Sequence, residues 1–329
     1  MHDLSGASVV ITGASSGIGR AAARAFAARG ARVTLAARRL EMLQDAAREC
    51  EQLGGRALPV RTDVSDPAAV DALRDAAMDA FGGIDIWVNN AGLGAIGAWQ
   101  DVPLEMHRRT IDVNLMGAMY GAYSVLPLFL RQGRGTIINT ISLAAWAPTP
   151  FAAAYTASKF ALRGFSASLR QELKPHRHIH VCGVFPAVVD TPGIVHGANY
   201  SGRSVDPGPY LYAPETVAEA IVSVARRPRD EVPVGWPSLA AQRAYGLAPW
   251  ATENVVGGIV RGALGRARAG AISDGAVLRT ILDGKRTSGG VRHRKGVPDA
   301  HRLNMMALGA AGAVLGVGAL AWAASHRRR

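Results

Sequence analysis

The sequence contains few cysteines and few lysines. Its 329 residues include only Cys50 and Cys182, too few for a framework of disulfide bonds or for a cysteine cluster around a metal ion. We therefore expect a reducing compartment, the cytoplasm, for the folded part of the chain, and no metal site. Apolar residues make up 49% of the chain and charged residues 19%, which favours a folded protein over a disordered one.

Arginine supplies most of the positive charge, and this charge is concentrated late in the chain. Residues 1–225 carry 20 Lys and Arg against 19 Asp and Glu, whereas residues 226–329 carry 17 against 6. A basic tail indicates an anionic partner, either nucleic acid or a membrane surface, or simply a solvated surface. The basic stretch at residues 292–302 has no recognisable nucleic-acid-binding motif and no interleaved aromatic residues for base stacking, so we expect no nucleic-acid partner. The four lysines among the 37 basic residues are Lys159, Lys174, Lys285 and Lys295.

A short apolar run near the start leads directly into a glycine-rich turn. The run covers residues 8–12 and leaves no room for a signal peptide, so we expect the mature protein to begin where the gene does. Beyond the turn, apolar residues recur at helical spacing as far as Phe26, and Gly30 is a suitable helix stop. The pattern predicts a strand, a turn and a helix in that order.

Short β-prone runs alternate with helical stretches over the first 235 residues. This alternation predicts parallel β-α-β units, and hence an α/β fold with a doubly wound parallel sheet. Such sheets bind ligands at the carboxyl ends of their strands, where this sequence places its polar and glycine-containing segments. The predicted strands after the first are RVTLAAR (32–38), RALPVRTDV (56–64), IDIWVNNAG (84–92), GTIINTIS (135–142) and HIHVCGVFP (178–186).

The turn TGASSGIG at residues 12–19 has glycines at positions 13, 17 and 19. Glycines at these places permit a tight bend, a close approach of the backbone to a pyrophosphate, and a helix N-terminus directed at negative charge. A glycine-rich turn alone could equally be an ordinary connection from strand to helix.

Four further motifs lie beyond this turn. They are NNAG at residues 89–92, Asn114 in DVNLMG, Ser142 at the end of IINTIS, and YTASK at residues 155–159. In these motifs and their order, the chain from about residue 5 to about residue 235 resembles the classical short-chain dehydrogenases/reductases. The resemblance implies a Rossmann fold, an oxidoreductase that binds NAD(P), and a homo-oligomer, either a dimer or a tetramer.

The resemblance assigns a role to each of four polar side chains. Tyr155 would give a proton to a substrate carbonyl, or accept one from an alcohol, while hydride is exchanged with the nicotinamide. Ser142 would hydrogen-bond the reacting oxygen, Lys159 would also hold the nicotinamide ribose, and Asn114 would support a water path to solvent. The cofactor-binding positions that the resemblance implies are Gly13, Ser15, Ser16, Gly17, Ile18, Gly19, Arg38, Asp63, Val64, Asn90, Ala91, Gly92, Tyr155, Lys159 and Thr191.

The spacing of Tyr155 and Lys159 has a physical reason of its own. Residues four apart on a helix share a face, so the ammonium can lie close to the phenol. A nearby cation favours the phenolate and lowers the pKa of tyrosine from about 10. On this interpretation the lysine activates the tyrosine.

The cofactor preference is predicted from LAARRLE, which comes directly after the second strand. Family members that prefer NAD carry an acid there, which hydrogen-bonds the adenosine ribose. This chain has Arg38 and Arg39 instead, and a guanidinium can bind a 2′-phosphate through two hydrogen bonds. We therefore expect NADP to be preferred, with NAD possible. The alternative is that both arginines only face water.

Substrate choice is expected to depend on the loop after Thr191. The preceding stretch PAVVDT has Ala187 where the family usually has glycine, which affects the path of this loop. The long loop has the character of a lid and contains few charges, which favours a lipophilic substrate. His196 is either a loop residue or a substrate contact. The other residues expected at the pocket are Leu143, Ala144, Trp146, Tyr200, Tyr210 and Tyr212.

The alternation of strands and helices stops near residue 235. We therefore divide the chain into a catalytic domain at residues 1–235, a basic extension rich in Gly, Pro and Arg at residues 236–302, and an apolar segment at residues 303–329. The stretch 254–270 has the pattern of a weak amphipathic helix, which could be a subunit contact, a helix lying on a membrane, or a cap over the site.

The apolar segment contains 20 uncharged positions, residues 305–324, long enough for a helix to cross a bilayer. Twelve of them are Ala or Gly, so insertion would be marginal, but Gly312 and Gly316 suit close helix packing in a membrane. We favour a C-terminal membrane anchor over a buried helix at a subunit interface. The basic residues just before it, Arg292, Arg294, Lys295 and Arg302, are placed to meet anionic headgroups.

The leading hypothesis is an NADP-dependent oxidoreductase that acts on a small, lipophilic carbonyl compound or secondary alcohol presented at a membrane. One rival is a non-catalytic NAD(P)-binding scaffold or sensor held at a membrane by its tail. A second rival is an epimerase or isomerase on the same fold, which would retain its cofactor and show no net turnover of it.

Overall fold

The computed structural model describes residues 3–204, 207–208, 210–280, 286–299 and 302–304, and for Val195 and His196 the backbone alone. The segment 305–324, for which the sequence predicts a membrane anchor, lies outside the described residues.

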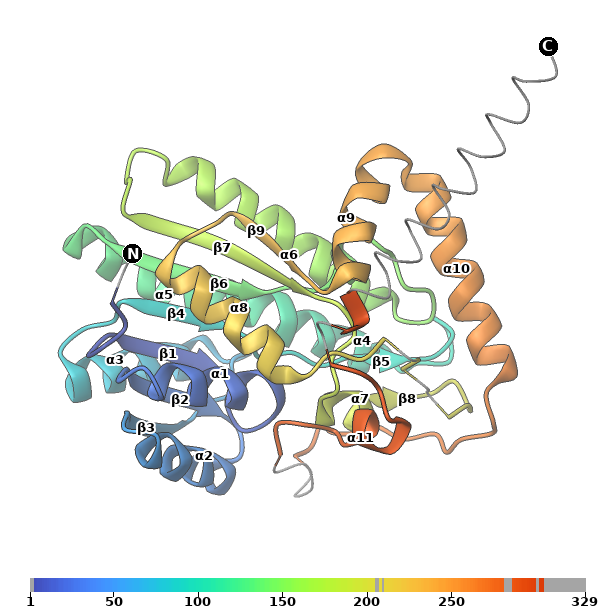
Figure 1. The fold of residues 1–329 in the computed structure, drawn as a ribbon, viewed down its shortest axis with the longest axis horizontal. Coiled ribbons are helices and arrows are strands. Elements are labelled where there is room, and N and C mark those ends of the chain that lie inside the picture. The colour runs from blue at the N-terminus through green and yellow to red at the C-terminus, as the bar shows by residue number, and fades with distance from the viewer. Residues whose placement is uncertain (1–2, 205–206, 209, 281–285, 300–301, 305–329) are drawn as a thin grey trace, which may run out of the picture.

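The core of the molecule is a seven-stranded parallel sheet in the order β3-β2-β1-β4-β6-β7-β9 (Figure 1). The α/β prediction of a doubly wound, Rossmann-type sheet is confirmed. The last strand was not predicted, because its sequence EVPV is short and contains a proline. Pro233 is tolerated there because β9 is an edge strand. The strands are β1 (Ser8–Thr12), β2 (Arg32–Ala37), β3 (Arg56–Arg61), β4 (Ile86–Asn89), β6 (Gly135–Thr140), β7 (Ile179–Pro186) and β9 (Glu231–Val234), and a separate pair joins β5 (Ala95–Ile96) to β8 (Ala198–Asn199).

Helices cover both faces of the sheet, and each face has its own apolar core. Alternation along β1 shows why: Val9 and Ile11 pack into one core and Val10 into the other, as the two-residue period of a strand requires. Helices α1 (Gly17–Ala27), α2 (Leu40–Gln52) and α8 (Pro214–Arg226) line the first core. The second is lined by α3 (Pro67–Phe81), α5 (Gly117–Gln132) and α6 (Ala153–Glu172).

The order of the strands determines where the ligand crevice lies. β1 lies between β2 and β4, so the chain winds outward in opposite directions from this strand. In such sheets the crevice for a ligand lies outside the carboxyl ends of the strands at this point of reversal. The glycine turn comes after β1 and the NNAG motif after β4, so both lie at this crevice.

Beyond the sheet, the chain forms two helices and then returns to the crevice. Figure 1 shows α9 (Trp236–Leu247) and α10 (Pro249–Arg266) at one end of the sheet, and the next segment of the chain beside α7 (Pro192–His196). A short helix, α11 (Val291–Lys295), lies in this returning segment. The predicted amphipathic stretch forms α10, but its Val255 and Ile259 are largely exposed.

Among the described residues, one helical stretch is long and apolar enough to cross a membrane. It is residues 104–132, which comprise α4 (Leu104–Ile111), a π-helical turn (Asp112–Met116) and α5. Its most apolar window is 56% buried, and its Val125 and Phe129 lie in the second core. This stretch is therefore a core helix of the domain.

Candidate active site

The glycine turn is packed so closely that side chains would not fit. A Cβ at Gly13 would lie 2.8 Å from Ala91 Cα, and one at Gly19 would lie 2.3 Å from the Gly13 carbonyl oxygen. Gly13 and Gly17 also have positive φ, 68° and 57°, which favours glycine. Helix α1 begins at Gly17, so the N–H groups of its first turn and its positive dipole end face the crevice.

Thr12 fastens this turn to the NNAG motif. Its Oγ1 accepts hydrogen bonds from the backbone N–H of Asn90 at 3.0 Å and of Ala91 at 3.1 Å, and donates to the Val88 carbonyl at 3.3 Å. The Asn90 amide donates in turn to the Thr12 carbonyl at 3.0 Å. Two motifs that are 78 residues apart in the sequence therefore share one hydrogen-bond network.

The two serines of the turn contact an arginine from the end of β2. Arg39 Nη2 donates to Ser15 Oγ at 3.3 Å and to Ser16 Oγ at 3.4 Å. Burial, and then repulsion from Arg20, lower the pKa of Arg39. Arg39 is thus held against the turn instead of only facing water. Ile18, the remaining residue of the turn motif, packs on the first core.

Asn114 lies in the π-helical turn between α4 and α5 and is 1% exposed. Its Nδ2 donates to the Leu93 carbonyl at 2.9 Å and to Ser158 Oγ at 3.1 Å, and its Oδ1 accepts from the Leu93 N–H at 2.8 Å. A Cβ at Gly92 would lie 3.4 Å from Asn114 Oδ1 and 3.8 Å from Lys159 Nζ. The glycine therefore keeps space open between the asparagine and the lysine.

Tyr155 lies beside Ser142, which begins the 3₁₀ turn Leu143–Ala145 after β6. Lys159, one helical turn along α6, is 4% exposed and donates to the Thr140 carbonyl at 3.0 Å. Its Nζ lies 5.7 Å from the centroid of the Tyr155 ring. The four predicted side chains therefore meet at the carboxyl ends of β4 and β6.

The expected lowering of the tyrosine pKa is wrong for this arrangement. Burial raises the pKa of Tyr155, and the hydrogen bond from Ser142 opposes this only in part. Burial also lowers the pKa of Lys159 to about 8, since its charge is removed from water. The ammonium donates to the Thr140 carbonyl, and its attraction for the phenolate is too weak to offset the burial of the phenol.

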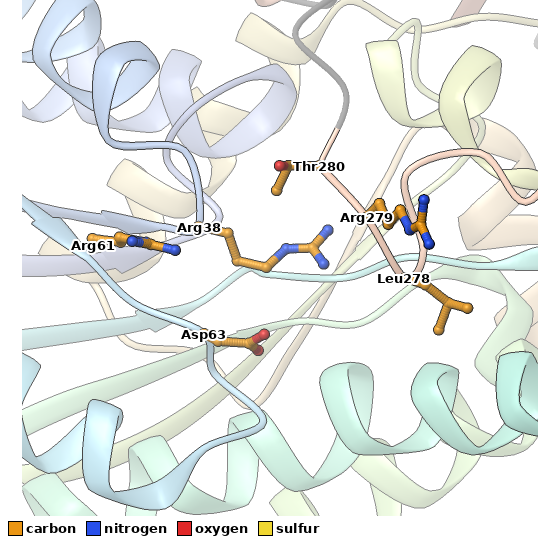
Figure 2. Close-up of a pocket in the computed structure, with 6 residues that line it drawn as sticks. All are labelled: Arg38, Arg61, Asp63, Leu278, Arg279 and Thr280. Carbon is orange, nitrogen blue, oxygen red and sulfur yellow. The ribbon is translucent and has the colours of Figure 1, made fainter.

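The expected adenosine end of the crevice is rich in arginine (Figure 2). Arg38 and Asp63 lie in one hollow, while Val64 is buried beneath it against α5. Burial alone would raise the pKa of Asp63, but hydrogen bonds from Arg109 and Ser65 lower it below its usual value. Arg109 was not predicted from the sequence, because its pairing with Asp63 joins α4 to the end of β3 and has no motif.

Thr191 lies at the other end of the crevice and caps α7. A Cβ at Gly17 would come within 3.2 Å of Thr191 Cγ2, so the two predicted positions are adjacent. The replacement of glycine by Ala187 needs no special backbone, since Phe151 is the only non-glycine residue with positive φ among the described residues.

Two of the aromatic residues expected at a substrate pocket are core residues. Tyr212 is 1% exposed, donates to Asn304 Oδ1 at 2.9 Å and accepts from the Trp236 N–H at 3.2 Å. Trp146 is buried and stacks on Phe185 with ring centroids 4.0 Å apart. These two predictions are wrong, because apolar contacts with β7 and the extension enclose both rings.

The other expected pocket residues differ in their surroundings. Tyr200 is hydrogen-bonded to Asp274, and Tyr210 is exposed and makes an edge contact with Trp236. Leu143 and Ala144 come directly after Ser142. The His196 side chain is not described.

The described residues contain no group of three or more His, Cys, Asp or Glu side chains that could hold a metal ion. Both cysteines are buried, and burial raises the pKa of each thiol to about 12.

Known proteins share this fold and these motifs. A family model described as short chain dehydrogenase matches residues 7–196. The 3beta-hydroxysteroid dehydrogenase 1 of Eggerthella lenta is 39% identical over 230 residues, which cover 68% of this chain and 88% of that protein. The chain therefore belongs to the short-chain dehydrogenase/reductase family. It is an NAD(P)-dependent oxidoreductase.

Solved structures agree with this membership. A short-chain dehydrogenase/reductase from Burkholderia phymatum in complex with NAD is similar with a TM-score of 0.67 at 27% identity, over 75% of this chain and 94% of that chain. A metagenomic short-chain oxidoreductase in complex with NADP is similar with a TM-score of 0.61 at 34% identity, over 71% and 98% of the two chains.

Proposed function

We propose that this protein is an NADP-dependent oxidoreductase that reduces a carbonyl group, or oxidises a secondary alcohol, on a small lipophilic substrate. The observation that carries the proposal is the meeting of Asn114, Ser142, Tyr155 and Lys159 at the carboxyl ends of β4 and β6, with the buried Lys159 Nζ 5.7 Å from the centroid of the Tyr155 ring. A polar cluster of this kind at the carboxyl ends of parallel strands provides a positioned proton donor next to a dinucleotide crevice.

The residues at the crevice fit a dinucleotide. The backbone at Gly13, Gly17 and Gly19 leaves no room for side chains, which suits a pyrophosphate held by N–H groups at the start of α1. When bound, the cofactor supplies or accepts the hydride. The other positions proposed to hold it are Ser15, Ser16 and Ile18 at the turn, Asp63 and Val64 at the adenine, Asn90, Ala91 and Gly92 at the adenosine ribose, and Tyr155, Lys159 and Thr191 at the nicotinamide half.

In the reductive direction, the Tyr155 hydroxyl donates its proton to the substrate oxygen while Ser142 hydrogen-bonds the same oxygen. The raised pKa of Tyr155 keeps the phenol protonated at neutral pH, which suits a proton donor. Once the proton has left, the Lys159 ammonium stabilises the phenolate. Asn114, fixed by Leu93 and Ser158, positions water that returns the proton.

The preference for NADP rests on Arg38 and Arg39, because a guanidinium attracts the dianionic 2′-phosphate that distinguishes NADP from NAD. Both arginines lie at the crevice, Arg38 beside Asp63 and Arg39 on the serines of the turn. NAD remains an alternative cofactor.

The lipophilic substrate class is supported by the few charges in the loop after Thr191 and by the name of the Eggerthella lenta relative, a hydroxysteroid dehydrogenase. We further propose that residues 303–329 anchor the protein to a membrane and that the catalytic part lies in the cytoplasm as a homo-oligomer. Full-length protein should then sediment with membranes after detergent-free lysis and require detergent for release. Recovery in the high-speed supernatant contradicts the anchor.

The proposed function is tested by replacing the proton donor. NADPH oxidation is followed against a panel of lipophilic ketones and aldehydes, with wild type and Tyr155→Phe side by side. Loss of a general acid should lower kcat by about 100-fold to 10,000-fold, while NADPH binding changes little. Tyr123→Phe, on an exposed ring of α5, is the matched control and should retain full activity.

Two outcomes would favour the rival functions. A product that differs from its substrate only in configuration, with no net consumption of NADPH, indicates an epimerase or isomerase. Binding of NADPH with no product from any substrate, and an unchanged cellular effect in Tyr155→Phe, indicates a scaffold or sensor.

A further inference from the structure

The chain beyond α10 returns across the cofactor crevice. We call residues 276–280 and 286–292 the strap. Figure 1 shows this part of the chain in orange and red beside α7, at the end of the sheet where the strands terminate. The family model ends at residue 196, so the strap lies beyond the part of the chain that it matches.

The first half of the strap is held by Arg38. The guanidinium donates to the Ala276 carbonyl at 2.7 Å and to the Val277 carbonyl at 3.3 Å. Val277 is buried in a small apolar cluster with Val102 and Met106. Arg38, which is proposed to select NADP, therefore also fixes the position of residues 278–280.

The second half is held by Asp190, next to Thr191. Asp190 accepts hydrogen bonds from Ser288 Oγ at 2.6 Å and from the Val291 N–H at 3.0 Å, and its carbonyl accepts from the Gly289 N–H at 3.0 Å. A Cβ at Gly289 would lie 2.8 Å from the Thr191 carbonyl oxygen, so the strap packs directly on Thr191, beyond the end of β7.

The strap also reaches the glycine turn. The Gly17 N–H donates to the Arg286 carbonyl at 3.3 Å. A phosphate oxygen bound by the Gly17 N–H would replace this carbonyl, so residues near Arg286 must shift when the pyrophosphate binds.

Between these attachments the strap closes one side of a hollow of about 390 Å³. Figure 2 shows Arg38 extended between Arg61 and Arg279, with Asp63 below them. Asp63, the one carboxylate among the described residues that line the hollow, is hydrogen-bonded to Arg109, so these lining residues carry an excess of positive charge. Among the described residues, no side-chain hydrogen bond or ion pair involves the guanidinium of Arg61 or Arg279. The residues lining the hollow are Arg38, Arg61, Asp63, Leu278, Arg279 and Thr280.

We propose that Arg279 of the strap, together with Arg61, completes with Arg38 a binding site for the 2′-phosphate of NADP. Guanidinium groups bind a phosphate monoester dianion through charge-assisted hydrogen bonds, and three of them line this hollow. Without such an anion, the three arginines around the hollow repel one another. The Arg109 guanidinium adds to this repulsion: burial, and then the charge of Arg109, lower the pKa of Arg38.

The inference rests on the proposed preference for NADP and goes beyond it in one respect. It makes the C-terminal extension a wall of the cofactor site that carries a specificity-determining side chain. A chain with the same motifs but no such strap would recognise the 2′-phosphate with Arg38 and Arg61 alone.

The test measures ligand binding and needs no substrate. Adenosine 2′,5′-bisphosphate and adenosine 5′-monophosphate are titrated calorimetrically into full-length wild type, Arg38→Ala, Arg279→Ala and Arg266→Ala. Arg266 is the matched control, an exposed arginine of the same extension that does not line the hollow. Loss of a charge-assisted contact should weaken binding of the bisphosphate to Arg279→Ala by about tenfold and leave the monophosphate within about twofold.

The outcomes separate this inference from the proposed function. A selective loss of bisphosphate binding in Arg279→Ala, absent in Arg266→Ala, supports the role of the strap. If Arg38→Ala alone loses selectivity, or Arg279→Ala weakens both ligands equally, the role of Arg279 is overturned while the NADP preference stands. If wild type binds the two ligands equally, the NADP preference fails and the inference fails with it.

Discussion

The sheet region and the C-terminal extension are held in place by different forces. The sheet region, residues 3–234, has nearly balanced charge and buries apolar side chains on both faces of the sheet. The extension is basic and leaves large apolar side chains in water: Leu247 is 87% exposed and Trp250 71%. Its returning part is fixed mainly by hydrogen bonds to Arg38, Asp190 and Gly17.

This difference bears on how the two regions form. Apolar burial, worth about 25 cal/mol per Å², stabilises the two main cores on the faces of the sheet, and neither of these cores contains a residue of the extension. The strap depends on residues that the sheet has already positioned, since its partners lie at the ends of β2, β1 and β7. We therefore expect damage to the sheet region to remove the strap, and damage to the strap to leave the sheet region folded.

The largest effect is expected from Gly19→Ala. The new Cβ would lie 2.3 Å from the Gly13 carbonyl oxygen and 2.6 Å from Asn90 Nδ2, so the start of α1 must move. Overpacking of this kind lowers the free energy of unfolding by about 1–3 kcal/mol. Because the N–H groups at the start of α1 are displaced, the affinity for the dinucleotide should fall by about 100-fold or more. Denaturant unfolding and calorimetric titration with NADPH measure the two effects. The matched change Gly164→Ala, on α6 with no atom within 4 Å of the new Cβ, should leave binding intact.

The second-largest effect is expected in the pH dependence of kcat, which should follow the charge of the buried Lys159. The pKa of Lys159 is about 8, so the ammonium is present below pH 8 and is lost as the pH rises through it. Since the charge stabilises the phenolate left by proton donation, kcat for carbonyl reduction should be level below pH 8. Above it, kcat should fall about tenfold per pH unit. A kcat profile from about pH 6 to about pH 10 checks this.

Lys174→Met, at an exposed position beyond α6, should have the same profile as wild type. A reduction rate that stays level to about pH 10 in wild type would mean that the charge of Lys159 is not required.

A smaller effect is expected from Gly289→Ala in the strap. The Cβ would meet the Thr191 carbonyl oxygen at 2.8 Å and Asp190 Oδ1 at 3.0 Å, which should loosen the strap without touching the sheet. Trypsin cleavage after Arg286 and Arg292 should become about tenfold faster, while the Tm changes by less than about 2 °C. A large drop in Tm would show that the strap and the sheet unfold as one unit.

The sequence was sufficient to predict six of the seven strands of the sheet, because strands with buried faces and glycines at close contacts leave periodic, local patterns. The polar cluster was implied by the resemblance to the short-chain family, and Asn114, Ser142, Tyr155 and Lys159 do come together. Patterns of this kind depend on residues near one another in the chain, which is why sequence analysis detects them.

The strap could not be predicted, because its contacts join residues that lie far apart in the chain. Its contacts join backbone carbonyls such as those of Ala276 and Arg286 to partners more than 200 residues away, and every residue type has a carbonyl. The burial of Tyr212 was missed similarly, because its enclosure depends on Asn304 and Trp236 of the extension. The direction of the Tyr155 pKa depends on burial, which spacing along a helix does not give.

The smallest predicted effect tests whether the extension unfolds independently of the sheet or together with it. Gly258 lies in the middle of α10 with no atom within 4 Å of a new Cβ, so Gly258→Ala should stabilise this helix by about 0.5–1 kcal/mol. If α10 opens independently of the sheet, amide hydrogen exchange should slow by about threefold to fivefold within α10 alone, and the Tm should stay constant. If exchange slows throughout the chain and the Tm rises, the extension unfolds together with the sheet, and the boundary near residue 235 does not separate two folding units.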